Sequence, residues 1–163
     1  MTLRRSLLLA IALFALSSPV RAADLDNPTG PQPTLPTEKL TITTRDGKVH
    51  EFNVEIAATS EQQTIGLMFR KEVPAGTGML FDWGGVRNSD MWMRNTISSL
   101  DMLFIDPDGK IHHIAENAVP QSLAVISSDG PVRGTLEIAA GSAEKLDIHV
   151  GDVVRQRIFG NAP

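Results

Sequence analysis

One stretch of the chain, residues 91–106, limits the possible folds more than any other. Two apolar runs in it, residues 91–93 and 100–105, flank a polar insert that begins with Arg94 and Asn95. Apolar runs bounded by polar residues are typical of buried strands, so we expect two strands with a bend between them. Polar groups so close to a core must find hydrogen-bond partners or take part in chemistry.

Alternating segments predict further strands on both sides of this stretch. Apolar and polar side chains alternate in residues 38–44 and 51–56, which is the periodicity of a half-buried strand. Asp46-Gly47 between them indicates a hairpin turn, because glycine accepts the positive φ angle that such turns require. A second turn signal lies at residues 106–109. The other strands are expected over residues 79–83, 110–117, 132–139 and 153–159.

Two short helices complete the expected elements. Ser60 and Gln63 form a capping-box pattern and apolar residues follow, so the first helix is expected over residues 61–69. Gly66 inside this helix would cost about 1 kcal/mol relative to alanine, which indicates close packing against its face. A second helix is expected over residues 142–148.

Many short strands at near-regular spacing, with two small helices, are typical of a β-sandwich or β-barrel. We therefore expect a mainly β (β-rich α+β) fold, with one compact sandwich- or barrel-like domain over residues 38–160. Within it, Gly84-Gly85 is expected to end a strand and residues 118–131 to be irregular. Residues 23–37 contain four prolines and few apolar groups, so we expect an extended linker there.

The first residues predict an export signal. Arg4 and Arg5 form a positive start, residues 7–16 form an apolar run, and a cleavage site is expected near Ala22. The apolar run is too short to span a bilayer as a permanent helix. We therefore expect a signal peptide over residues 1–22 and a periplasmic or secreted protein without a stable membrane anchor.

Charge and cysteine content exclude several classes of function. Loss of residues 1–22 would leave twelve basic against nineteen acidic residues, a formal charge of −7. Such a chain would be repelled by phosphate backbones, so we expect no nucleic-acid partner. The absence of cysteine from the sequence excludes disulfides, thiol catalysis and thiolate zinc sites.

Several motifs, taken in order along the chain, resemble those of the domain of unknown function 192 family (DUF192). The resemblance covers nearly all of residues 40–159 and implies a compact β-rich domain, often exported in bacteria, without assigning a biochemical role. The motifs that carry it are Gly66-Leu67-Met68-Phe69-Arg70, Gly78-Met79-Leu80-Phe81, Met91-Trp92-Met93-Arg94-Asn95-Thr96, residues 100–106, residues 116–120, Leu136-Glu137-Ile138 and Ala140-Gly141.

The candidate binding site is a set of polar side chains around Trp92. Two arginines of the set could clamp a carboxylate or sulfate, and its amide and carboxylate groups could bind sugar hydroxyls beside Trp92 or Trp83. A network of structural ion pairs would give the same mixture of charges. The candidate ligand-binding residues are Trp92, Arg94, Asn95, Asp101, Glu116, Arg133 and Glu137.

Two other chemistries remain as alternatives. Asp101 with Glu116 or Glu137 could act as the acid and base of a glycosidase-like envelope hydrolase. Met91 and Met93 would share one face of a strand and could bind Cu(I), although methionines also fill irregular gaps in cores.

The interpretation that we favour is a non-catalytic binding or assembly module. It would recognise a small polar or anionic ligand, or an envelope protein, by hydrogen bonds beside an aromatic wall. We expect no cofactor.

Overall fold

The fold is seen in a computed structural model that describes residues 27–162. The predicted signal peptide, residues 1–22, and the first residues of the predicted linker lie outside the described residues. The strands are β1 (Thr37–Thr43), β2 (Val49–Ala57), β3 (Thr77–Met91), β4 (Leu100–Ile105), β5 (Ile111–Ala118), β6 (Ile126–Ala139) and β7 (Val153–Arg155). The helices are α1 (Ser60–Ile65), α2 (Ser142–Leu146) and a 3₁₀ turn, η1 (Arg157–Phe159).

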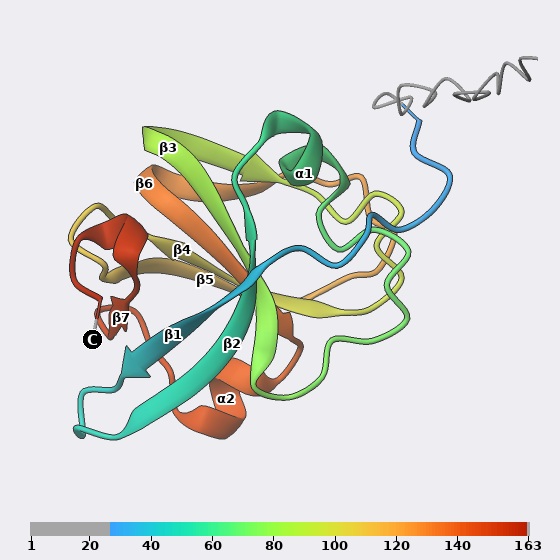
Figure 1. Ribbon diagram of the computed structural model, residues 1–163. Coiled ribbons are helices and arrows are strands. Elements are labelled where there is room, and N and C mark those ends of the chain that lie inside the picture. The colour runs from blue at the N-terminus through green and yellow to red at the C-terminus, as the bar shows by residue number, and fades with distance from the viewer. Residues whose placement is uncertain (1–26, 163) are drawn as a thin grey trace, which may run out of the picture.

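Within these residues, seven strands form one curled sheet in the order β5-β4-β6-β3-β2-β1-β7 (Figure 1). The two edges of the sheet approach each other, because Lys110 next to β5 forms a bridge with Val153 of β7. Backbone hydrogen bonds from Ile111 N to Asp152 O (3.0 Å) and from Val154 N to Gly109 O (2.7 Å) support this seam. The sheet is therefore a half-barrel, and the prediction of a mainly β, barrel-like domain with two short helices is confirmed.

The chain crosses from β2 to β3 through α1, and these two strands pair in parallel. The other strand pairs of the sheet are antiparallel, including the β1–β2 hairpin predicted at Asp46-Gly47. A parallel pair needs a crossover connection, and the α1 segment supplies it. Figure 1 shows α1 and α2 at opposite ends of the curled sheet.

Helix α1 begins and ends earlier than expected. Its capping box joins Thr59 and Gln62 in place of Ser60 and Gln63, and the helix ends at Ile65. Gly66 terminates it with a φ of +49°, a conformation that glycine adopts without steric cost. A Cβ atom at Gly66 would lie 3.0 Å from Cζ of Phe81, so the predicted close packing at this glycine is confirmed.

Three predicted strand limits are wrong. Gly84-Gly85 does not end a strand, because β3 continues to Met91 and accommodates the glycines in a bulge where its register with β6 shifts. β6 begins at Ile126, inside the stretch expected to be irregular. The last strand, β7, stops at Arg155, where η1 follows after Gln156.

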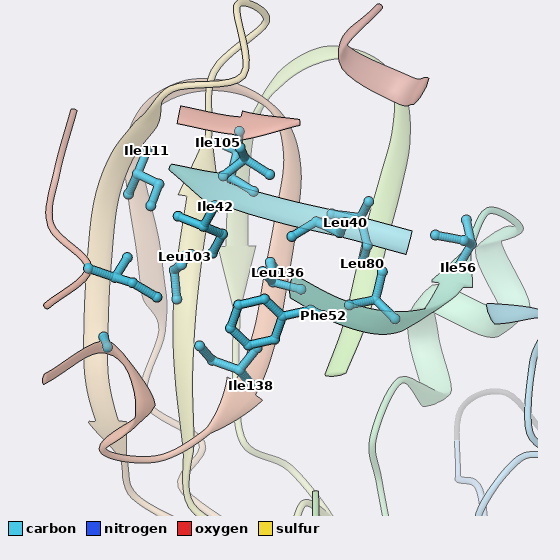
Figure 2. Packing of buried hydrophobic residues seen from close by; sticks show 14 residues of the cluster. Leu40, Ile42, Phe52, Ile56, Leu80, Leu103, Ile105, Ile111, Leu136 and Ile138 are labelled. Carbon is cyan, nitrogen blue, oxygen red and sulfur yellow. The ribbon is translucent and has the colours of Figure 1, made fainter. Parts of the chain in front are cut away.

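The buried side chains form two layers, one inside the curl of the sheet and one on its outer face. Alternate residues of a strand point to opposite faces, so β4, which is buried along its whole length, contributes to both layers. Figure 2 shows the inner layer, with Leu40, Phe52, Leu80, Leu103 and Leu136 packed together. The outer layer includes Met79, Phe81, Met93, Met102 and Phe104.

The described part of the Pro-rich segment lies against the domain. The side chain of Gln32 is 8% exposed, and its Nε2 atom donates to Gln62 O (3.0 Å) and Gly66 O (2.9 Å). Leu35 N donates to the carboxylate of Glu55 (2.7 Å). These contacts hold the segment to the end of α1 before it enters β1. No helix within residues 27–162 is long and apolar enough to cross a membrane.

Candidate functional site

The outer face of the sheet has a hollow of about 370 Å³ beside the C-terminal end of α1. We call it the Glu137 pocket. Its lining comes from α1 and the residues that follow it, from β3, from the loop after β3 and from one residue of β6. The residues that define its chemistry are Gln63, Met68, Phe81, Trp83, Trp92 and Glu137.

Strand register places Glu137 at this pocket. Its Cα partners are Met79 of β3 and Met102 of β4, so two buried methionines lie beside it on the same face. The neighbours of Glu137 in the chain, Leu136 and Ile138, point into the inner layer. A single acid is thus directed into the outer apolar layer by the alternation of β6.

The side chain of Glu137 is mostly buried, but its carboxyl oxygens are not fully sealed from solvent. The side chain is 4% exposed, and no donor among the described residues hydrogen-bonds its oxygens or pairs with its charge. Burial raises the pKa of Glu137 to about 8, because removal from water disfavours the charged form. The floor of the pocket is therefore an acid that gains charge only near or above neutral pH, or when a cation approaches it.

Aromatic rings form the walls. Phe81 and Trp83 lie on the same face of β3 and stack with their ring centroids 5.6 Å apart. The indole nitrogen of Trp83 donates to Oγ1 of Thr135 (3.2 Å), which fixes the ring. The guanidinium carbon of Arg87 lies 5.2 Å from the Trp83 ring centroid. Trp92, which is 44% exposed, stands at the mouth of the pocket.

The structure brings together some of the residues predicted from the sequence. Trp92 and Glu137 both line the pocket. The guanidinium carbon of Arg94 lies 4.9 Å from the Trp92 ring centroid, so Arg94 is at the edge of the site. Asn95 adopts a φ of +56°, and its amide nitrogen lies 3.8 Å from the sulfur of Met68, another lining residue.

Asp101 lies outside the pocket and organises the backbone on the other face of the sheet. It is fully buried, and its carboxylate accepts hydrogen bonds from Asn117 N (2.9 Å), Gly141 N (3.2 Å) and Ala143 N (2.9 Å). Gly141 is the N-cap of α2 and offers no side chain to cap the helix. Asp101 supplies the missing acceptor from β4, which is a structural role.

Glu116 and Arg133 also lie outside the pocket. Glu116 is exposed on β5. Arg133 forms a short ion pair with Asp82 that joins β6 to β3. Burial would raise the pKa of Asp82, but the hydrogen bonds from Arg133 and Gly84 N, together with the positive charges of Arg133 and Arg157, hold the pKa below its ordinary value. The seven predicted residues therefore do not form one site, and no clamp of Arg94 with Arg133 exists.

Comparison with known proteins gives the same family as the motifs in the sequence. The model of the family described as DUF192, "Uncharacterized ACR", matches residues 41–156. The chain belongs to the DUF192 family. The resemblance predicted from the motifs is thereby confirmed.

Solved structures similar to this DUF192 chain share its fold. A protein from Sinorhizobium meliloti, described as a candidate transcription regulator, is 41% identical with a TM-score of 0.76; the match covers 78% of this chain and 98% of that one. A protein of unknown function from Novosphingobium aromaticivorans is 37% identical with a TM-score of 0.73, covering 78% and 91%. A search of the curated proteins finds no match.

The geometry of this DUF192 domain does not assemble a carboxylate pair at the pocket. Asp101 is the Cα partner of Ile138, so its side chain shares the face of Ile138, opposite to that of Glu137. Glu116 is exposed on another strand. In the described part of the chain, no three or more His, Asp or Glu side chains are placed to hold a metal ion. Met93 is fully buried in the outer layer, while Met91 is half-buried and lines the pocket.

Sequence reasoning missed Gln63, Phe81 and Arg87 as lining residues. One signal could have found Phe81, because Met79, Phe81 and Trp83 alternate along β3 and therefore share a face. The contribution of Gln63 depends on the crossover through α1, which has no local signal in the sequence. The position of Arg87 depends on the bulge at Gly84-Gly85.

Proposed function

We propose that this DUF192 protein is a non-catalytic binding protein and that the Glu137 pocket takes a small polar ligand. The observation that carries the proposal is a buried acid, without a partner in residues 27–162, at the floor of a hollow with aromatic walls. Natural pockets for small molecules combine apolar and aromatic walls with a few convergent polar groups. An unpaired polar group in an apolar layer costs stability, and a ligand that pairs with it would offset that cost.

The placement of the charged groups, and not their net charge, favours a neutral or cationic ligand over an anion. Asp90 and Glu137 are the acids that line the pocket, while Arg87 of the lining and Arg94 at its edge each lie over a tryptophan ring. Arg133, which could have attracted an anion, is paired with Asp82. Among the ligands expected from the sequence, the polar class is therefore preferred to the anionic class.

We also propose that the protein is exported and acts in the envelope. The support is the basic start at Arg4 and Arg5, the apolar run of residues 7–16 and the small residue Ala22. Cell fractionation with mass measurement of the N-terminus would test this. A protein recovered from the cytoplasm with residues 1–22 intact would contradict it.

A role in transcription regulation through DNA, suggested by the description of the Sinorhizobium protein as a transcription regulator, is not proposed for this chain. Its formal charge of −4 opposes association with phosphate backbones.

The test of ligand binding is a thermal unfolding screen of the purified protein. The panel would contain sugars, amino acids, amines, small carboxylates and Ag(I). A ligand at one hundred times its dissociation constant adds about 2.7 kcal/mol of stability, which moves the midpoint by several degrees.

A pocket-blocking variant shows where a hit binds. Thr64 is exposed on α1 and lines the pocket, so Thr64→Trp should fill the hollow without disturbing the core. Val150→Trp adds the same ring at an exposed position that does not line the pocket. We expect a hit to be lost in Thr64→Trp and kept in Val150→Trp. A panel without hits, or hits that both variants keep, would contradict the proposal and direct the search to a protein partner.

A further inference from the structure

We infer that the ligand of the Glu137 pocket is an organic cation whose ammonium group pairs with the carboxylate of Glu137. This inference rests on the proposed function and specifies the chemical class of its ligand. Three features of the pocket support it: the charged groups around Glu137, the direction of the hydrogen-bonding groups, and the nature of the walls.

The charged groups around Glu137 leave its carboxylate without a cation. On the flanking strands, its neighbours are Met79 and Met102, which offer no hydrogen-bond donor. Within the described chain, the side chain of Glu137 makes no ion pair and no hydrogen bond. Arg87, the basic residue of the lining, lies over the ring of Trp83. A cationic partner must therefore come from outside the described residues.

Gln63 also lines the pocket, and its amide keeps an unused acceptor. Its Nε2 atom donates to Ala57 O (3.3 Å) and to Asp82 O (2.7 Å), so both of its N–H groups are used. The Oε1 atom remains as an acceptor. The hydroxyl of Thr64 already donates to Ser60 O (2.8 Å). Glu137 and Gln63 thus offer acceptors to which an ammonium group can donate.

The walls of the pocket attract positive charge. The faces of Trp rings carry negative potential and attract cations within about 6 Å of their centroids. Both tryptophans already do so, because Arg87 and Arg94 lie 5.2 and 4.9 Å from the centroids of Trp83 and Trp92. Met68 and Met91 add polarizable thioethers to the lining. The walls can therefore take the apolar part of an organic cation while its ammonium group pairs with Glu137.

The experiment compares ammonium probes with neutral probes of the same shape. Benzylamine is paired with benzyl alcohol, and n-butylamine with n-butanol, and binding is measured by isothermal titration calorimetry at pH 7. Each amine should bind more tightly than its alcohol by about tenfold to a hundredfold, the range for hydrogen bonds to charged groups.

Proton release gives an independent measurement in the same titrations. With its pKa raised to about 8 by burial, Glu137 is about nine-tenths protonated at pH 7. An ammonium probe that pairs with the carboxylate displaces this proton, so about 0.9 proton should be released for each amine bound. The dependence of the enthalpy on the ionisation enthalpy of the buffer reports this number. The alcohols should release none.

Two variants test whether the preference for amines and the release of protons both arise at Glu137. Glu137→Gln keeps the size and shape of the side chain but removes its charge, so amine affinity should fall to the level of the alcohols and proton release should disappear. Glu116→Gln, an exposed acid on β5 outside the pocket, should leave both unchanged.

The outcomes separate this inference from the proposed function. If alcohols bind as tightly as amines, release no proton and are blocked by Thr64→Trp, the pocket binds a neutral ligand and the cation inference is wrong. If amines bind equally well to Glu137→Gln, the inference is also wrong. If no probe is blocked by Thr64→Trp, both the inference and the proposed function fail.

Discussion

Relative to the wild type, the free Glu137→Gln protein should become more stable as pH rises. The folded protein holds the proton of Glu137 until about pH 8, whereas the ordinary pKa of a glutamate is 4.5. Between these values, the unfolded chain binds fewer protons than the folded protein, so the contribution of Glu137 to stability falls as pH rises. Below pH 4.5 both states are protonated, and above pH 8 both are charged, so the contribution is constant outside this window.

The size of the effect follows from the two pKa values. One unit of pKa difference corresponds to about 1.4 kcal/mol, so the shift from 4.5 to about 8 amounts to about 5 kcal/mol above pH 8. At pH 7 the same relation gives about 3 kcal/mol, and near pH 4 almost nothing. Burial of the glutamine amide adds a cost of its own, which does not depend on pH. The test therefore measures the free energy of unfolding of Glu137→Gln and of the wild type, and asks how the difference between them changes with pH.

Urea unfolding, followed by the fluorescence of Trp83 and Trp92, would measure this difference at pH 4, 7 and 9. Other titrating groups are common to both proteins and cancel in the difference. Glu116→Gln, an exposed acid, should give a nearly constant difference from the wild type. If the stability curves of Glu137→Gln and the wild type run parallel from pH 4 to 9, Glu137 is not a buried acid with a raised pKa, and the reasoning for the pocket fails.

Three further predictions concern residues that hold the fold around the pocket, each measured by urea unfolding. Asp101→Ala should lower the free energy of unfolding by about 3 kcal/mol or more, because three backbone N–H groups lose their acceptor. Gly66→Ala should lower it by about 1–3 kcal/mol, since the φ of +49° and the 3.0 Å approach to Phe81 both oppose a Cβ atom. Gln32→Ala should lower it by about 1–2 kcal/mol through loss of the bonds to Gln62 O and Gly66 O.

Matched controls separate these effects from general sensitivity to substitution. Asp108→Ala is at an exposed turn, and Gly85→Ala adds a Cβ that meets nothing within 4 Å, so each should change stability by about 0.5 kcal/mol or less. Equal losses in Asp101→Ala and Asp108→Ala would refute the capping role. If Gly66→Ala is as stable as the wild type, the ring of Phe81 moves away freely from the added Cβ atom. If Gln32→Ala is as stable as the wild type, the Pro-rich segment does not stay docked on the domain.

Local patterns were sufficient to predict much of the sheet. Asp46-Gly47 lies in a two-strand unit whose alternation is visible in the sequence, so the β1–β2 hairpin was found with nearly correct limits. Gly66 also carried a local signal of close packing. The parallel pairing of β2 with β3 has no such signal, because it depends on which face of the sheet α1 covers.

The site was harder to predict because its parts depend on tertiary structure. In Leu136-Glu137-Ile138, alternation alone suggests that Glu137 faces water, but β6 is central and is covered on both faces. Asp101 binds the start of α2, which is forty residues away in the chain, so a residue that resembles a site acid is a helix cap. The polar insert that begins at Arg94 was predicted to matter for binding, and the structure places Arg94 beside Trp92 at the mouth of the pocket.

The seam of the half-barrel has a consequence for how the chain folds. β7 is a three-residue strand beside β1, yet it also meets the start of β5 through the bridge of Val153 with Lys110. The curl cannot close until the end of the chain arrives, so closure joins residues of high sequence separation and should be a slow, late step. With so few hydrogen bonds, the seam should also open before the rest of the sheet. Amide exchange at Val154 should therefore be faster than at Leu103 in the middle of β4.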